Sequence, residues 1–351
     1  MKILLISYNL RRRGGIERLS LDVVEALQAQ GHQLVLLSTM RLGPGLLGRL
    51  LGQLWFLCRL AIASRRCGQL FCMHALLLAQ VEWLLPPTMP RICWLHGVEV
   101  WGTALAPLAA ALCRCRLLVA SSNFTCNKVL EQSHPWPPVV VINPPARLWF
   151  GQVLPEPLPA QAQGLRMLTV ARMAADERYK GHDLITDALC LLKTANWHWQ
   201  IVGIGDDQLR LRALVNKFGL AEQVCFSGAL NDDQLRQAYQ DCNLLVMPSS
   251  YGLRTDGSAT GEGFGITYLE AAMAGRASLA CIEGGQSDLI QVGSTGWLVQ
   301  PNVEDLLKNL QSIINNSHEL ARRGAAAQKY ANLLFTYQNF QKRLDNAVTE
   351  D

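Results

Sequence analysis

Short apolar runs alternate along the chain with segments whose apolar positions recur at helical spacing. The runs are four or five residues long and rich in Val, Ile and Leu, which is typical of strands buried on both faces of a parallel sheet. Helical patterns separate them, for example at residues 183–192, 208–218 and 233–240. The pattern predicts one series of strands at 3–7, 34–38, 70–73, 91–95, 117–120 and 139–142, and a second at 167–170, 199–202, 224–227, 244–247 and 278–281.

This alternation predicts an α/β fold built on parallel sheets that are wound by right-handed crossovers. A chain of 351 residues exceeds the size at which one core stops growing, so two domains are expected. The two series predict two Rossmann-like domains facing across a cleft, at residues 1–152 and 165–330, joined by a Pro-, Gln- and Ala-rich linker at 153–164. Ligands of such sheets bind beyond the carboxyl ends of the strands.

The net charge of +4 hides an asymmetry between the two halves of the chain. Residues 1–150 hold 15 Lys and Arg against 6 Asp and Glu, which gives +9, whereas the remainder carries −5. A basic first half indicates an anionic partner or surface. No nucleic-acid recognition motif accompanies it, so nucleic acid is not expected as a partner.

The 11 cysteines are scattered, odd in number and form no C-x-x-C pair. This pattern predicts reduced thiols in a cytoplasmic protein and disfavours a disulfide framework or a zinc site. The apolar start of the chain lacks a cleavage site of small residues and is interpreted as a first strand, not as a signal peptide.

Residues 46–63 are strongly apolar but are interrupted by Arg49, Gln53 and Arg59. The segment is too short and too charged to be interpreted as a membrane span. Its aromatic residues and flanking arginines fit a helix that lies in the interface of an anionic membrane. The alternative is a helix that packs on the core and exposes its arginines.

Two carboxylates eight positions apart, Glu262 and Glu270, carry the strongest chemical signal of the sequence. Glu262 lies among Gly261, Gly263 and Gly265, where the backbone can approach a ligand closely, and a helix is predicted to start directly afterwards. Glycines that lead into a helix N-terminus favour anions, and fixed carboxylates bind hydroxyls, so a sugar nucleotide fits the combination. The alternative for Glu270 is a capping box with Thr267, in which it only serves its own helix.

Further candidate residues follow other strands of the second series. Arg172 and Lys180 lie between a predicted strand end and a helix start, where two cations would neutralise a diphosphate. Gly203 and Gly205 form a G-x-G turn, but Gln208 stands where a dinucleotide fingerprint requires its third glycine, which disfavours an NAD enzyme. In the first series, the pair Gly14 and Gly15 precedes a helix, and His96 follows a strand, where it could bind a hydroxyl or polarise a developing charge.

In this order the motifs resemble those of the retaining glycosyltransferases of family 4, which have the GT-B fold. The strongest match is the family's E-x7-E signature at Glu262 and Glu270. The pair Arg172 and Lys180, the Gly203–Gly205 turn and residues 284–285 match in the same order, and Gly14, Gly15 and His96 match more loosely.

The resemblance implies a role for each of these residues. Arg172 and Lys180 would hold the diphosphate of a nucleotide-sugar donor, Glu262 the sugar hydroxyls and Glu270 the ribose hydroxyls. The donor would also meet the backbone of Gly263, Phe264 and Gly265, and His96 would touch its sugar from the first domain. Residues 331–351 would form a helix that crosses back to the first domain. Residues 143–146 and Arg276 with Ala277 depart from the family pattern, the latter with an expected effect on packing only.

The sequence therefore predicts a metal-independent hexosyltransferase without a cofactor. It contains no Asp-x-Asp pair, no Walker A loop and no Gly-x-Ser-x-Gly elbow. The donor is expected to be GDP-mannose or a UDP-hexose, and the acceptor a glycan, a lipid-linked sugar or a small molecule, in polysaccharide or glycolipid synthesis. Two alternatives stay open: a nucleotide-dependent epimerase or dehydrogenase, and an inactive scaffold that binds sugar nucleotides.

Overall fold

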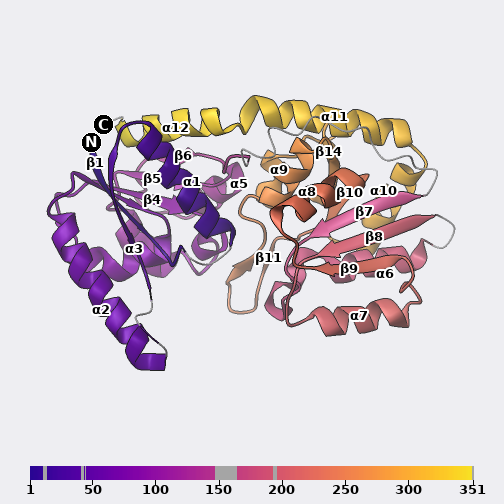
Figure 1. The fold of residues 1–351 in the computed structure, drawn as a ribbon, viewed down its shortest axis with the longest axis horizontal. Coiled ribbons are helices and arrows are strands. Elements are labelled where there is room, and N and C mark those ends of the chain that lie inside the picture. Colours follow the sequence, from indigo (N-terminus) through magenta and orange to yellow (C-terminus); the bar gives the residue numbers. More distant parts are fainter. Residues whose placement is uncertain (11–13, 41–42, 44, 147–163, 193–195, 350–351) are drawn as a thin grey trace. The chain divides into compact units, whose positions relative to one another are not determined.

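The computed structural model describes residues 1–10, 14–40, 43, 45–146, 164–192 and 196–349. The chain divides into two compact units, each built around its own parallel sheet (Figure 1). Unit 1 comprises Met1–Pro145, Thr255–Ala259 and Tyr337–Asp351, and unit 2 comprises Ala146–Arg254 and Thr260–Thr336. The predicted α/β fold is confirmed, while nearly all of the predicted linker at 153–164 lies outside the described residues.

The sheet of unit 1 has six parallel strands in the order β2-β1-β3-β4-β5-β6. The strand β1, between β2 and β3, buries Ile3, Leu4, Leu5 and Ile6 completely, as expected for a sheet that is covered on both faces. The strands lie close to their predicted positions: β1 (Lys2–Ser7), β2 (Gln33–Ser38), β3 (Gln69–Cys72), β4 (Arg91–Leu95), β5 (Leu117–Ala120) and β6 (Val139–Val141).

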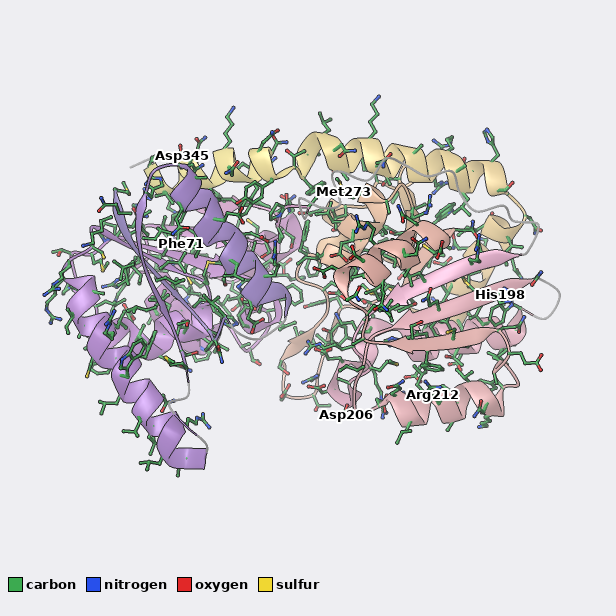
Figure 2. The ribbon with its side chains drawn as sticks, in the orientation of Figure 1. Phe71, His198, Asp206, Arg212, Met273 and Asp345 are labelled. Atoms are coloured by element: carbon green, nitrogen blue, oxygen red, sulfur yellow. The ribbon has the colours of Figure 1, made fainter. Side chains whose placement is uncertain are left out.

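Helices on both faces complete unit 1 (Figure 1). Phe71 on β3 lies in the core between the sheet and the helices, as Figure 2 shows. The helical segments are α1 (Gly15–Ala29), α2 (Gly45–Ser64), α3 (Ala75–Val81), η1 (Glu82–Leu84), η2 (Val98–Val100), η3 (Ala106–Leu108), α4 (Ala109–Leu112), α5 (Asn123–Leu130) and α12 (Tyr337–Thr349).

The end of the chain is divided between the units at Thr336, not at the expected residue 330. Phe335 packs against Phe264 of unit 2 at a ring-centroid distance of 5.9 Å. Phe340, on α12, instead packs against Trp94 of unit 1 at 6.3 Å. The boundary between the units thus lies between Phe335, which packs in unit 2, and Phe340, which packs in unit 1. Helix α11 (Ser317–Leu334) belongs to unit 2 over its whole length.

The sheet of unit 2 also has six parallel strands, in the order β14-β13-β10-β7-β8-β9. The edge strand β14 did not figure among the predicted strands. The strands of this sheet are β7 (Leu165–Val170), β8 (Trp197–Val202), β9 (Val224–Gly228), β10 (Leu244–Met247), β13 (Ala277–Cys281) and β14 (Gly296–Val299). Its helical segments are η5 (Ala175–Lys180), α6 (His182–Leu191), α7 (Gln208–Lys217), α8 (Asp232–Asp241), α9 (Ile266–Met273), η6 (Gly285–Asp288), α10 (Val303–Ile314) and α11.

Between β10 and α9 the chain forms a short hairpin of β11 (Gly252–Leu253) and β12 (Ala259–Thr260). Its tip is counted with unit 1, because the amide of Thr103 donates to the carbonyl of Gly257 at 3.0 Å. The Thr103 hydroxyl donates to the carbonyl of Asp256 at 3.2 Å. Gly257 has a φ of +77° at this turn, a conformation that favours glycine.

Candidate functional site

The candidate residues of unit 2 lie in loops that follow the carboxyl ends of β7, β8 and β10. Since the three strands are parallel neighbours, these loops meet at one edge of the sheet. The loop after β7 carries Arg172 and Lys180, the loop after β8 carries Gly203 and Gly205, and the loop after β10 leads to Glu262.

A buried ion pair joins two of the predicted residues at this edge. The ammonium of Lys180 lies 2.6 Å from Oε1 of Glu262, and the two side chains are 14% and 11% exposed. The hydroxyl of Ser249, which is fully buried, donates to the same carboxylate oxygen at 3.0 Å. The structure therefore brings the loops after β7 and β10 together through one carboxylate.

Lys180 keeps its charge in this pair. Burial by itself lowers the pKa of the ammonium, but the nearby carboxylate of Glu262 and further favourable contacts outweigh burial, so that the pKa is raised. The ammonium also lies 5.1 Å from the ring centroid of Tyr179. A lysine has three N–H donors, so one bond to Glu262 leaves two that can reach an anionic ligand.

The two glycines of the loop after β8 allow direct contact between neighbouring backbones. A Cβ atom on Gly203 would lie 2.0 Å from the carbonyl oxygen of Ala171, and one on Gly205 would lie 1.9 Å from that of Met173. The amide of Asp207 donates to the carbonyl of Met173 at 2.9 Å. These glycines are therefore needed for packing between two loops, beside any approach of a ligand.

The loop that carries Glu262 is fixed in the same way. A Cβ atom on Gly285 would lie 2.2 Å from the carbonyl oxygen of Gly263, and the amide of Gly285 donates to the carbonyl of Glu262 at 2.7 Å. The side chain of Phe264 is buried in the core, which leaves its backbone as the part that can face a ligand. Gly265 has a φ of +92° and is the N-cap of α9.

Glu270 does not form the capping box that was the alternative for it. The helix begins at Ile266 with Gly265 as its N-cap and without a side-chain cap, so Thr267 already lies inside the first turn. Oε2 of Glu270 instead accepts a hydrogen bond from the hydroxyl of Tyr239 on α8 at 2.9 Å. The carboxylate is only 3% exposed, and a neighbouring helix fixes its direction.

Arg276, where the expected effect was on packing only, has a polar role as well. It is 1% exposed, and its guanidinium donates to the carbonyls of Tyr239 at 3.1 Å and Gln240 at 2.7 Å. A cation that binds the carbonyls at a helix C-terminus stabilises that end. Arg276 thus holds the turn of α8 from which Tyr239 reaches Glu270.

Arg172 is 73% exposed and forms an ion pair with Glu177. The carboxylate of Glu177 also raises the pKa of Lys180, as a smaller contribution than that of Glu262. Glu177 therefore interacts with both predicted cations. The structure places Arg172 and Lys180 in one loop, where they share this carboxylate as a neighbour and have no hydrogen bond to each other. Sequence reasoning missed Glu177, although its position within η5 between two cations is a usable signal.

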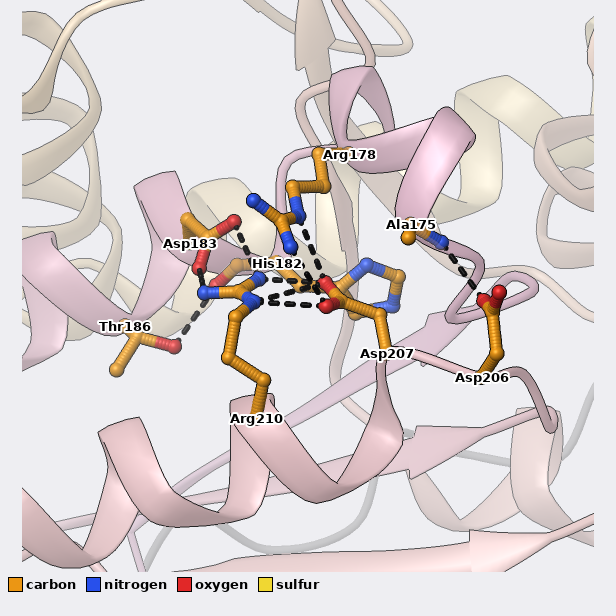
Figure 3. A network of polar contacts seen from close by, with 8 residues as sticks. All are labelled: Ala175, Arg178, His182, Asp183, Thr186, Asp206, Asp207 and Arg210. Carbon is orange, nitrogen blue, oxygen red and sulfur yellow. Dashed lines mark hydrogen bonds and ion pairs between the residues drawn. The ribbon is translucent and has the colours of Figure 1, made fainter.

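A network of charged residues connects η5, α6 and α7, as Figure 3 shows. The guanidinium of Arg210 binds Asp183 at 2.8 and 2.9 Å and Asp207 at 2.8 Å, and Arg178 binds Asp207 at 2.9 and 3.0 Å. The hydrogen bonds from Arg210, followed by those from Arg178, hold the pKa of the Asp207 carboxyl well below its usual range. This network holds the loop that carries Lys180 against the loop after β8.

His182, the first residue of α6, is buried beside this network (Figure 3). Burial lowers the pKa of its imidazole from 6.5 to about 4, because a charged ring would lose its hydration. The ring is therefore neutral at neutral pH.

In unit 1, His96 follows β4 as predicted and is held by the loop around it. The carboxylate of Glu99 accepts hydrogen bonds from the amides of His96 at 2.5 Å and Gly97 at 2.9 Å. Nε2 of His96 lies 2.6 Å from the carbonyl of Met73 and must carry the proton, since a carbonyl only accepts. Burial lowers the pKa of His96, so its Nδ1 is an acceptor at neutral pH.

Two residues that sequence reasoning missed lie beside His96. The ring of His74 lies 5.5 Å from that of His96, and the ring of Tyr8 lies 5.0 Å from that of His74. Burial lowers the pKa of His74 to about 4, and its Nδ1 accepts from the amide of Leu76 at the start of α3. Only the position of each residue directly after a strand could have signalled this group.

Gly14 and Gly15 begin α1 at the same edge of the sheet of unit 1. Gly14 is the N-cap, Gly15 the first helical residue, and Glu17 lies in the first turn. No group of His, Cys, Asp and Glu side chains within the described part of the chain is arranged to hold a metal ion. All 11 cysteines are free thiols.

Comparison with known proteins gives matches for both sequence and fold. Residues 160–330 match the family model described as glycosyl transferases group 1. The chain is similar to the alpha-1,3/1,6-mannosyltransferase of Dictyostelium discoideum, with 28% identity over 138 residues, which is 39% of this chain and 30% of that protein. It is also similar to the GDP-mannose-dependent alpha-(1-6)-phosphatidylinositol monomannoside mannosyltransferase of Mycobacterium tuberculosis, with 27% identity over 153 residues, which is 43% of this chain and 39% of that protein.

The chain thus covers only about a third of the length of these curated relatives. Solved structures match along the whole chain. HepE of Anabaena in complex with UDP has a TM-score of 0.77 at 18% identity and covers 100% of both chains. Sucrose-phosphate synthase of Thermosynechococcus elongatus has a TM-score of 0.80 at 18% identity and covers 99% of this chain and 98% of its own. At this identity the likeness establishes the GT-B fold.

Proposed function

We propose that the chain, whose residues 160–330 match the family model of the group 1 glycosyltransferases, transfers a hexose from a nucleotide-diphosphate sugar to an acceptor hydroxyl, with retention of anomeric configuration and without a metal ion. The donor would bind in unit 2 at the carboxyl ends of β7, β8 and β10. The observation that carries the proposal is the buried ion pair of Lys180 and Glu262, which lies between glycine-lined loops at that edge.

In this proposal Lys180 neutralises the diphosphate. Its raised pKa keeps the ammonium charged through the neutral range, and its two remaining donors suit phosphate oxygens. Arg172 assists after it exchanges Glu177 for the phosphate. Fixed cations that face the developing charge of the leaving diphosphate lower the barrier to cleavage of the C–O bond.

The two carboxylates would bind hydroxyls. As the family resemblance implies, Glu262 would contact the sugar and Glu270 the ribose. Each carboxylate is already oriented for binding by a hydrogen bond, from Ser249 and Tyr239 respectively. Gly263, Phe264 and Gly265 would approach the donor through their backbone, as would Gly203 and Gly205. In unit 1, Nδ1 of His96 would accept a hydrogen bond from a sugar hydroxyl, and Gly14 and Gly15 would lie near the phosphate or the acceptor.

The reaction would break the bond between the anomeric carbon and the diphosphate and form a bond from that carbon to the acceptor oxygen. The acceptor proton would pass to the leaving diphosphate, so that no protein nucleophile is required. One relative is named as GDP-mannose-dependent, and one similar structure contains UDP, which supports GDP-mannose and UDP-hexoses as the donors to test. Glycan, lipid-linked and small-molecule acceptors are the classes proposed, for an enzyme that acts in the cytoplasm or at the inner face of a membrane.

A thermal-shift experiment with the purified protein tests the donor site. UDP, GDP, ADP, their common sugars and NAD are added one at a time, in the presence of EDTA. We expect one nucleoside diphosphate and its sugar to raise the melting temperature of the wild type and of Lys329→Met, which removes an exposed lysine, but not that of Lys180→Met. A shift with NAD alone would indicate a dehydrogenase or epimerase instead.

Turnover separates an enzyme from a scaffold. Release of the nucleoside diphosphate is followed with the donor identified above and a panel of glycan, lipid-linked and soluble acceptors. Binding of the donor without release in the presence of any acceptor would support an inactive scaffold and contradict the proposal.

A further inference from the structure

Helix α2 exposes an apolar face in the part of unit 1 that the structure describes. Six large apolar side chains on it are between 37% and 71% exposed: Leu46, Leu47, Leu50, Leu51, Leu54 and Trp55. These six residues define the α2 face. In Figure 1 the first turns of α2 extend beyond the sheet of unit 1, and the α2 face lies on this part of the helix.

The other side of the same helix is anchored in unit 1. Gly48, Gly52, Phe56 and Leu60 recur every four residues and are buried, which gives a stripe along one side of a helix. The exposed leucines lie on the opposite side at the same spacing. The segment was expected to be too short and too charged for a membrane span, but α2 has 20 residues and is apolar enough to cross a membrane by length and composition. Since one side of the helix packs on unit 1, the helix can lie along a membrane surface, whereas crossing a bilayer would remove it from its own core.

The positive charge around α2 indicates which kind of partner the α2 face can bind. Residues 26–81 contain no Asp or Glu but five arginines, which are Arg41, Arg49, Arg59, Arg65 and Arg66. Arg59 is exposed and lies 5.5 Å from the ring centroid of Trp55, at the border of the α2 face. A second copy of the chain would bring like charges together, whereas an anionic lipid surface would be attracted.

A second exposed aromatic residue lies next to this helix. Trp83, on η1, is 72% exposed, and η1 contacts α2 within unit 1. Tryptophan is enriched where proteins enter the interface between lipid and water, because its ring is apolar and its N–H is polar.

We propose that α2 docks unit 1 on an anionic membrane, with the α2 face in the interface between head groups and acyl chains and the exposed Arg59 on the head groups. Leucine and tryptophan on one face, with Arg59 at its border and the exposed Arg49, Arg65 and Arg66 in or just after the helix, is the composition of a helix that lies in the membrane plane. Where the proposed function holds, docking selects a lipid-linked acceptor from the three classes, because it places the enzyme where such acceptors are anchored.

The test is co-sedimentation of the full chain with vesicles, without donor, so that it does not depend on transferase activity. Vesicles of equal parts phosphatidylglycerol and phosphatidylcholine are compared with vesicles of phosphatidylcholine alone. We expect binding to the anionic vesicles that weakens as salt is raised, and a loss of about tenfold or more in the double variant Leu47→Glu with Leu54→Glu. Leu191→Glu and Leu333→Glu, which change exposed leucines on helices of unit 2, are expected to bind as the wild type does.

The thermal unfolding of the double variant and its shift with the nucleoside diphosphate are measured in parallel. Both are expected to equal those of the wild type, which separates loss of docking from misfolding and from failure of the donor site. Absence of wild-type binding to anionic vesicles, or equal binding by the double variant, would overturn the proposal. A wild-type dimer in solution that the double variant abolishes would overturn it in favour of a second copy of the chain.

Discussion

Lys180 and Glu262, 82 positions apart in the sequence, form an ion pair of 2.6 Å in which each residue has a second partner. The carboxylate also accepts from Ser249, and the ammonium lies over the ring of Tyr179. We predict that Lys180→Met and Glu262→Gln each lower kcat/KM for transfer by about 100-fold or more, because each removes a group proposed to contact the donor. Initial rates with the donor identified by thermal shift provide the measurement.

The same pair predicts an asymmetric effect on stability. Lys180→Met leaves a buried carboxylate without its cation and is expected to lower the free energy of unfolding by about 3 kcal/mol. When Glu262→Gln is added to Lys180→Met, part of that loss should be restored, since the uncompensated charge is removed. Urea unfolding of the two single variants and the double variant gives the coupling, and strictly additive losses would show that the pair is not coupled.

Tyr239→Phe tests whether the orientation of Glu270 matters for binding. The variant removes one hydroxyl from a buried side chain and should destabilise the protein by about 1 kcal/mol. We expect a several-fold rise in the Kd of the nucleoside diphosphate with little change for inorganic diphosphate, because Glu270 is assigned to the ribose. Equal loss for both ligands would place Glu270 elsewhere.

Gly285→Ala tests the close approach of two backbones beneath Glu262. The added methyl would lie 2.2 Å from the carbonyl oxygen of Gly263, so the loop must shift, and a loss of about 2 kcal/mol or more in the free energy of unfolding is expected. Gly68→Ala is the matched control, because its methyl would meet its nearest atom at 3.8 Å. Similar unfolding curves for the two variants would contradict the close packing.

The buried His182 predicts a loss of stability in mild acid. Its pKa is about 4 in the folded chain, below the 6.5 of an unperturbed histidine, so the unfolded chain takes up the proton first as the pH falls. Its contribution is complete above pH 6.5 and decreases as the pH falls toward 4, by about 3 kcal/mol at most. The free energy of unfolding is measured by urea denaturation at several pH values between these limits. It should fall less steeply with falling pH in His182→Gln than in the wild type, and an equally steep fall would assign the effect to other groups.

Most of the strands could be predicted because their sequences carry the pattern of a doubly buried sheet. The predicted bounds at 91–95, 117–120 and 244–247 are those of β4, β5 and β10. β14 has only three apolar residues after Gly296, at the edge of the sheet, which is too weak a pattern to distinguish from a loop.

The candidate site was less accessible from the sequence than the fold. Glu262 and Lys180 were identified by their loops, but their contact depends on how the loops after β7 and β10 meet. Thr267 and Glu270 have the spacing of a capping box, and only the start of α9 at Ile266 shows that they do not form one. Tyr239 could be assigned to a helix, but no local pattern states which carboxylate its hydroxyl will reach.

Unit 1 is not continuous in sequence, and this has a consequence for synthesis on the ribosome. Phe340 and Leu344 of α12 lie in the same core as Leu19 and Val23 of α1. A nascent chain that ends at residue 145 already contains the whole sheet of unit 1 but has nothing to cover that side of α1. Unit 2 can therefore fold around its own core before α12 has been synthesised, whereas unit 1 cannot complete its core until α12 is present. The half of the chain that is synthesised first is thus expected to be the last to finish folding.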